Sequence, residues 1–252
     1  MPDVYGYRLK LGVVTPSVNT VVQYEYDQMR PKGVTNHLAR IHVPNIVTRD
    51  DSALQQSVSD LDSALDAAVE RVLSAEVDVV VLGVSIEAIY GDPEAGQRIE
   101  QRLRARLDVP DLRLVHAGDA IPAALRAYGI TDGPIALLTP YGPAGEPHLG
   151  AFVERCGYKM HAVRHLVSPS LVQIAHNPPA AIRPLVEELA DSGAQAIVQF
   201  GANLPFGPVA SQAEADLGLP VIAVNTATYW HALRTSGITD QIDGFGRLLA
   251  EH

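Results

Sequence analysis

The sequence repeats three short motifs in the same order, and this internal repeat constrains the fold more than any other feature. A recurrence of ordered motifs indicates that one structural unit has been duplicated. The three pairs are LGVVTPSVNT (11–20) with IALLTPYGPA (135–144), VDVVVLGVS (77–85) with AQAIVQFGAN (194–203), and AALRAYGI (123–130) with HALRTSGI (231–238). We therefore expect two related halves.

The apolar stretches of the chain are short, rich in Val, Ile and Leu, and separated by helical patterns. Such runs are typical of strands that are buried on both faces of a parallel sheet. Strands are predicted at about 8–14, 37–43, 77–83, 112–116, 134–138, 159–166, 194–200 and 220–224. Helices are predicted between them, among others at 52–75, 93–107, 119–128, 179–192 and 226–236. The predicted fold class is α/β, with two pseudo-symmetric four-stranded parallel-sheet, Rossmann-like halves and an inter-domain cleft.

Helix boundary signals support these elements. Asp51-Ser52 and Asn177-Pro178-Pro179 are typical helix starts, because short polar side chains cap a first turn and proline fits its first position. Gly129 and Gly237 follow helical patterns and suit the left-handed conformation at a helix end. We assign residues 1–117 plus 226–252 to the first half and 118–225 to the second, with helix 226–236 returning to the first.

Composition excludes several classes of protein. The net charge of −10 and the isoelectric point near 5.3 argue against a nucleic-acid surface, which needs clustered Lys and Arg. The first ten residues, MPDVYGYRLK, carry charges and do not resemble a signal peptide. A membrane span needs roughly 18 apolar residues in a row, and no stretch is that long. The expected location is the cytoplasm.

The sequence predicts neither a metal nor a cofactor. The single cysteine, Cys156, excludes an internal disulfide and a cysteine-based zinc site. His161 and His165 are four residues apart but lie on a predicted strand, so they do not form a helical metal motif. Glycine patterns for dinucleotides and for the phosphates of ATP are absent, which disfavours nicotinamide, flavin and ATP.

The ligand site is expected in the cleft between the halves. Open parallel sheets bind ligands beyond the carboxyl ends of their strands, where loops and helix starts present backbone N–H groups. The motifs place Thr15, Ser17, Asn19, Gly83 to Glu87, Thr139 to Tyr141 and Gly201 to Asn203 at such ends. Convergent donors of this kind suit a small carboxylate.

These motifs resemble the aspartate/glutamate racemase superfamily, in the branch of the maleate cis-trans isomerases and arylmalonate decarboxylases. The resemblance spans nearly the whole chain and is carried by TPSVNT (15–20), LGVSIEAIYG (82–91), LLTPYG (137–142), FGANLPF (200–206) and GFGRLL (244–249). It implies cofactor-free chemistry beside a carboxylate, through an enediolate-like anion. Racemases of this group use two cysteines, one from each half, as acid and base.

The chain departs from the family at both cysteine positions. The first position falls on Gly83 or on its neighbour Val84, and the second falls on Gly201. Cys156 lies elsewhere, in the helix-end segment ERCGY. The decarboxylase branch keeps a cysteine in the second half and has glycine in the first, so its proton donor is also missing here. Thiol-based racemisation is therefore not expected.

The anion-holding residues of the family have counterparts here. Ser85 and Tyr141 match side chains that bind the enediolate in the decarboxylases, and Asn19 matches the carboxylate-binding asparagine of the isomerases. Val84 replaces a threonine of the decarboxylases. We predict Glu87, Tyr141 and Ser85 as catalytic, and we predict substrate contacts from Thr15, Asn19, Gly83, Val84, Ser85, Ile86, Tyr141, Gly201, Ala202 and Asn203.

Each candidate also has a structural interpretation. Ser85, Thr15 and Asn19 are suited to capping the helices that follow them, and Asn203 to stabilising a turn. Tyr141 and Tyr90 could pack on the cleft wall. Glu87 is either an exposed loop charge or, if burial raises its pKa, a general acid or base.

The leading hypothesis is a cofactor-independent lyase or isomerase that acts on a small carboxylate or dicarboxylate. Decarboxylation, hydration or elimination, and double-bond isomerisation all stay open, with the proton carried by Glu87, Tyr141 or water. One alternative is a non-catalytic carboxylate-binding protein. Another is a hydrolase or hydratase whose cleft carboxylate activates water. A homodimer is the expected assembly.

Overall fold

The computed structural model describes residues 3–85 and 95–252, and it holds two four-stranded parallel sheets. The first has the strand order β2-β1-β3-β4, and the second has the order β6-β5-β7-β8. The strands are β1 (Leu9–Pro16), β2 (Val34–Ile41), β3 (Val79–Leu82), β4 (Leu114–Val115), β5 (Pro134–Thr139), β6 (Lys159–His165), β7 (Ile197–Gln199) and β8 (Val221–Ala223). The two orders are equivalent under the repeat, which confirms the predicted fold class.

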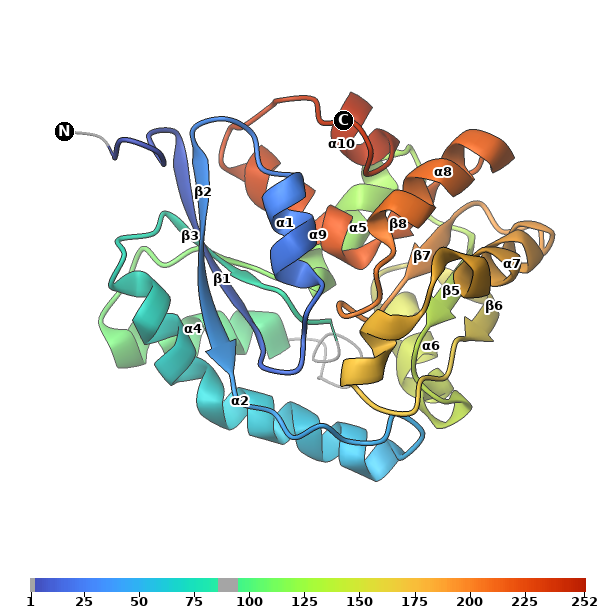
Figure 1. The fold of residues 1–252 in the computed structure, drawn as a ribbon, viewed down its shortest axis with the longest axis horizontal. Helices are drawn as coiled ribbons and strands as arrows, with labels where there is room; N and C mark the ends of the chain where they lie inside the picture. Colours follow the sequence, from blue (N-terminus) through green and yellow to red (C-terminus); the bar gives the residue numbers. More distant parts are fainter. Residues whose placement is uncertain (1–2, 86–94) are drawn as a thin grey trace.

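Helices cover the faces of both sheets (Figure 1). Their bounds are α1 (Val22–Gln28), α2 (Asp51–Leu73), α4 (Ala95–Leu107), α5 (Ala117–Ala127), α6 (Glu146–Arg155), α7 (Pro179–Ala190), α8 (Gly207–Leu217), α9 (Val224–Thr235) and α10 (Arg247–Glu251). Short 3-10 helices occupy Pro143–Gly145 and Val172–His176. No described helix is both long enough and apolar enough to cross a bilayer.

The central strands show why the apolar runs become sheets. All four residues of β3 are buried, and β1 buries every residue except Lys10. Parallel strands between two helical layers must be apolar on both faces, so β-branched runs are favoured there. In the first sheet Leu11 pairs with Val79, and in the second Leu137 pairs with Val198. The two central pairs therefore bring equivalent motifs of the repeat to equivalent places.

Several element bounds differ from those expected. β2 begins at Val34 rather than at 37, because Leu9 at the start of β1 pairs with Val34. β4, β7 and β8 are shorter than predicted, at two, three and three residues. Helices α1, α6 and α8 were not among those named in advance; α8 buries small residues such as Ala210 and Ala213 and has no clear apolar stripe.

The helix-start prediction at Asp51-Ser52 was wrong by one residue. Asp50 is the capping residue of α2, and its side chain accepts a hydrogen bond from the Ala53 N–H. The start at Pro178-Pro179 is confirmed, since Pro179 is the first residue of α7. Gly129 and Gly237 have φ values of +76° and +75°, as expected for glycines that follow helix ends.

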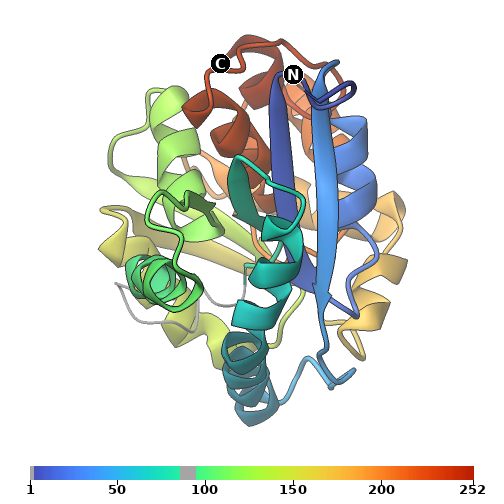
Figure 2. The same ribbon diagram turned by 90° about the vertical axis from the view of Figure 1, so that its left-hand side faces the viewer.

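Helix α9 follows the last strand of the second sheet but packs against β3, β4 and α1 of the first half and against α5 (Figure 1). Both ends of the chain lie on the same side of the molecule, as Figure 2 shows from a second direction. The division of the chain at residues 117 and 225 stays a prediction.

Loops at the carboxyl ends of the two sheets are joined by hydrogen bonds. The Thr48 side chain donates to the Ser168 carbonyl, and the Gly142 N–H donates to the Thr48 carbonyl over 3.2 Å. The Leu171 N–H donates to the Ile46 carbonyl over 3.1 Å. The segment between β2 and α2 is thus fastened to the second half beside the strand ends.

Candidate active site

A small cavity of about 40 Å³ lies where the strand-end loops of both halves meet. Its lining includes seven of the predicted site residues, namely Asn19, Gly83, Val84, Ser85, Tyr141, Ala202 and Asn203. Val43, Leu61, Leu171 and Ile174 supply apolar walls. One water needs roughly 10–15 Å³ measured in this way, so the cavity has room for about three waters.

The end of β1 contributes Thr15 and the loop after it contributes Asn19, and both are hydrogen-bonded within the first half. The Thr15 hydroxyl donates to the Gly83 carbonyl over 2.9 Å and links the ends of β1 and β3. The Asn19 side-chain oxygen accepts from the N–H groups of Val21 and Val22, both at 2.9 Å, and so caps α1. Its amide nitrogen is the group left to meet a ligand in the cavity that Asn19 lines.

Ser85 connects the two halves directly. Its hydroxyl oxygen accepts a hydrogen bond of 3.0 Å from the N–H of Gly201, a residue 116 positions away in the sequence. Ser85 is 1% exposed. A hydroxyl can donate one hydrogen bond while accepting another, and no described residue accepts one from Ser85. The Ser85 hydroxyl can therefore donate to an anion in the cavity.

Gly83 and Gly201, where the sequence predicted the two cysteine positions, differ in their steric setting. Gly201 has a φ of +99°, and a Cβ atom there would lie 2.4 Å from Cγ and 2.5 Å from Cδ of Pro140. At Gly83 a Cβ would lie 2.7 Å from a methyl group of Val22, with no unusual φ. The backbone at 201 is therefore shaped for glycine.

The segment after Gly201 offers backbone donors. The Asn203 side chain holds the halves together: its oxygen accepts from the Thr20 N–H at 2.9 Å, and its nitrogen donates to the Leu171 carbonyl at 2.8 Å. The side chain thus has a structural role besides lining the cavity. No described backbone group accepts a turn or ladder hydrogen bond from the N–H of Ala202 or Asn203, and both residues border the cavity.

Tyr141 also lines the cavity and is 7% exposed. Its N–H donates to the Thr139 hydroxyl over 3.3 Å. Its carbonyl lies 2.9 Å from Nδ1 of His165, whose Nε2 is 2.8 Å from a Glu146 carboxylate oxygen. His165, considered from the sequence only as a metal ligand, thus fixes the backbone of the tyrosine.

Glu25 is a second residue that sequence reasoning missed. It lies on α1, is 2% exposed, and accepts from the Gly207 N–H at 3.0 Å and from the Asn225 side chain at 2.7 Å. Asn225 also donates to the Ala202 carbonyl over 3.0 Å, so Glu25 supports the cleft loop of the second half. Burial raises the pKa of Glu25 to about 7. The residues on either side of Glu25 in the sequence form no motif that would have indicated a functional role.

Two predicted residues, Ile86 and Glu87, lie outside the described residues, as does Tyr90. Among the described residues that line the small cavity, Tyr141 is the only titratable side chain. No group of three or more His, Cys, Asp or Glu residues that could hold a metal ion occurs in the part of the chain that the structure describes. Cys156 directly follows the last residue of α6, and burial raises the pKa of its thiol to about 11.

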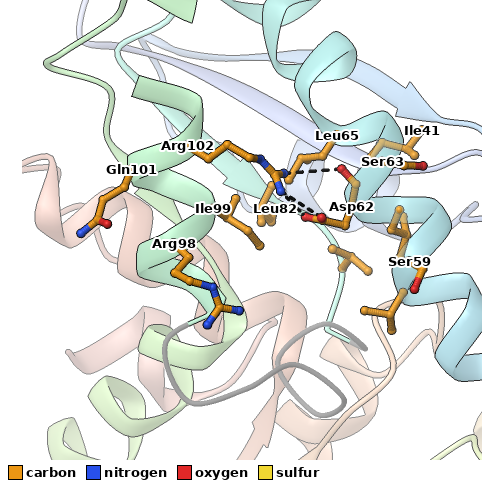
Figure 3. Close-up of a pocket in the computed structure, with 13 residues that line it drawn as sticks. Ile41, Ser59, Asp62, Ser63, Leu65, Leu82, Arg98, Ile99, Gln101 and Arg102 are labelled. Carbon is orange, nitrogen blue, oxygen red and sulfur yellow. Dashed lines mark hydrogen bonds and ion pairs between the residues drawn. The ribbon is translucent and has the colours of Figure 1, made fainter. Parts of the chain in front are cut away.

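A much larger cavity, of about 780 Å³, lies between α2 and α4 (Figure 3). Leu61 and Val84 line both cavities, so the two adjoin. In Figure 3 Arg102 reaches from α4 across to Asp62 of α2, at 2.8 Å, whereas Arg98 points away from this pair. Buried side chains such as Leu65 and Leu82 make up the apolar wall.

Comparison with known proteins agrees with this architecture. The family model of arylmalonate decarboxylase matches residues 50–249. Maleate isomerase of Geobacillus stearothermophilus is 22% identical over 96% of this chain and 97% of its own length. The structure of Nocardia farcinica maleate cis-trans isomerase bound to TRIS has a TM-score of 0.84, with 22% identity over 96% of this chain and 98% of that one.

A structure of arylmalonate decarboxylase has a TM-score of 0.73, with 19% identity over 96% of this chain and 100% of that one. At these identities the solved structures show the common fold. The family model, in contrast, matches well over half of the sequence. The chain therefore belongs to the arylmalonate decarboxylase family.

Proposed function

We propose that this protein is a cofactor-independent lyase or isomerase that acts on a carboxylate, and that the lyase reaction, loss of carbon dioxide from a malonate-type acid, fits the site best. The observation that carries the proposal is the convergence of donors from both halves on one cavity, with Gly83 in its lining and Gly201 next to the lining residue Ala202. The family supports isomerase or decarboxylase chemistry on small carboxylates.

The choice of decarboxylation rests on what each reaction needs. A Nocardia farcinica maleate cis-trans isomerase variant has been captured with a covalently bound succinylcysteine intermediate, so that protein uses a cysteine nucleophile. Gly83 and Gly201 supply none here. Decarboxylation needs an anion site and a proton donor but no nucleophile on the protein.

In the proposed reaction the bond from the α-carbon to one carboxylate breaks and carbon dioxide leaves. The electron pair stays on the α-carbon and spreads onto the remaining carboxylate, which becomes an enediolate. The Ser85 hydroxyl, the Asn19 amide and the N–H groups of Ala202 and Asn203 stabilise this charge, since fixed donors act strongly where water is excluded.

A proton must then reach the α-carbon. Tyr141 is the one titratable group among the described lining residues, and Glu87 follows Ser85 by two positions in the sequence. We assign the transfer to Glu87, with Tyr141 holding the anion. A protein that binds carboxylates without turnover is the second candidate, favoured by the steric block that Pro140 forms at Gly201.

Proton NMR in deuterated water tests the proposal. The purified protein is incubated with substituted malonates, maleate, hydroxy acids and lactones, and products are followed over time. Loss of carbon dioxide should leave deuterium at the α-carbon. Ser85→Ala should lower turnover by about 10²–10³-fold, whereas Ser74→Ala, at an exposed helix end, should not. Binding of malonates without turnover would support the second candidate instead.

A further inference from the structure

The cleft cavity alone is too small for a whole substrate. At about 40 Å³ it holds about three waters' worth of space, whereas ligand pockets commonly measure about 300–1,000 Å³. A carboxylate group fits the small cavity, and the remainder of the molecule must lie elsewhere. The cavity of about 780 Å³ between α2 and α4 is the adjoining space.

The chemistry of the larger cavity differs from that of the cleft. Its inner wall is formed by Ile41, Leu65 and Leu82, which are 3%, 5% and 2% exposed. Val58 of α2 and Ile99 of α4 face it from opposite sides. Ion pairs of Arg102 with Asp62 at 2.8 Å and with Asp66 at 3.1 Å tie the two helices together beside it. Polar side chains complete the lining, namely those of Ser59, Ser63, Arg98 and Gln101. The inner, buried part of the space therefore suits an apolar group, with polar side chains at its border.

We propose that the cavity between α2 and α4 holds an extended apolar substituent of the carboxylate whose acid group binds in the cleft. The expected substrates are therefore acids that carry a large apolar group. That group is larger than the carbon skeleton of maleate or of an acid with a single ring. The inference rests on the proposed function, because that function places the acid group in the cleft. Val84, which borders both cavities, lies where the substituent leaves the cleft.

Binding of an ω-phenylalkanoate series tests the inference without any need for turnover. Phenylacetate, 4-phenylbutyrate and 8-phenyloctanoate are titrated by calorimetry against the full chain. Each buried methylene should tighten binding by up to about fourfold, so 8-phenyloctanoate should bind at least tenfold more tightly than phenylacetate.

Two variants fill the cavity from opposite walls, and one serves as a control. Ile99→Trp and Val58→Trp should abolish the gain with chain length and leave phenylacetate binding within about twofold. Gln97→Trp lies on the same helix, at an exposed position that does not line the cavity, and should keep the gain. Equal affinity along the series in the unmodified protein would overturn the inference, as would a gain that survives both cavity variants.

An uncharged probe separates the cavity from the carboxylate site. N-phenyl-1-naphthylamine, which fluoresces in apolar surroundings, should be taken up by the unmodified protein and by Gln97→Trp but not by Ile99→Trp. If no acid binds, the proposed function fails; probe uptake that Ile99→Trp blocks would then still support an apolar site, and no uptake would overturn it.

Discussion

Placing a thiol at Gly201 should damage the fold much more than placing one at Gly83. At Gly201 a side chain meets two costs: φ is +99°, and its Cβ would overlap Cγ of Pro140 at 2.4 Å. A residue in a sparsely populated conformation costs about 1–3 kcal/mol, and overpacking costs about 1–3 kcal/mol more. Gly201→Cys should therefore lower the free energy of unfolding by about 2–6 kcal/mol.

At Gly83 the obstacle is a single methyl group of Val22 at 2.7 Å, and φ is ordinary. Gly83→Cys should cost about 1–3 kcal/mol through overpacking alone. Gly237→Ala is the matched control for conformation, because Gly237 has a φ of +75° and no atom within 4 Å of the added Cβ. It should cost about 1 kcal/mol.

Urea unfolding followed by the fluorescence of the single tryptophan, Trp230, gives the comparison, because Trp230 lies in the buried helix α9. With a slope of about 3 kcal/mol per molar urea, Gly201→Cys should shift the midpoint down by about 0.7–2 M. Gly201→Ala should shift it nearly as far, since the Cβ causes the overlap. Equal midpoints for Gly201→Cys and Gly83→Cys would refute the steric reasoning.

Three further predictions concern titratable groups. Burial raises the pKa of Glu25 from 4.5 to about 7. The contribution of Glu25 to the free energy of unfolding is therefore full below pH 4.5, and roughly 3 kcal/mol of it is lost as the pH rises through 7. Urea midpoints at pH 5 and pH 8 should differ less in Glu25→Gln than in the unmodified protein. Iodoacetamide at pH 8 should leave turnover unchanged, because the raised pKa of Cys156 keeps it a thiol; inactivation traced to Cys156 by mass spectrometry would contradict this. Glu87→Gln should lower turnover by about 10²–10⁴-fold and remove one limb of the pH profile of turnover. Glu100 pairs with Arg104, and the control variant Glu100→Gln should keep both limbs and the turnover rate. An unchanged pH profile in Glu87→Gln would show that Tyr141 or water carries the proton instead.

Periodicity and repetition were enough to predict the sheets. β-branched apolar runs such as VVVL can only be buried between two helical layers, and the ordered repeat requires that the runs divide into equivalent sets. The same reasoning placed Asn19, Ser85, Tyr141 and Asn203 at strand ends, and the structure brings all four to one cavity. Bounds of short edge strands such as β4 were less accurate, because partner register sets them.

Contacts between the halves were decided by tertiary structure alone. Ser85 meets Gly201 across 116 residues of sequence, and Glu25 on α1 meets Gly207 across 182. No local pattern encodes such a pairing, because it depends on how two separately formed sheets pack against each other. The overlap that Pro140 creates at Gly201 and the cavity between α2 and α4 arise in the same way. The sequence thus determines which loops meet, while the packing of the halves determines which atoms in those loops are left to hold a ligand.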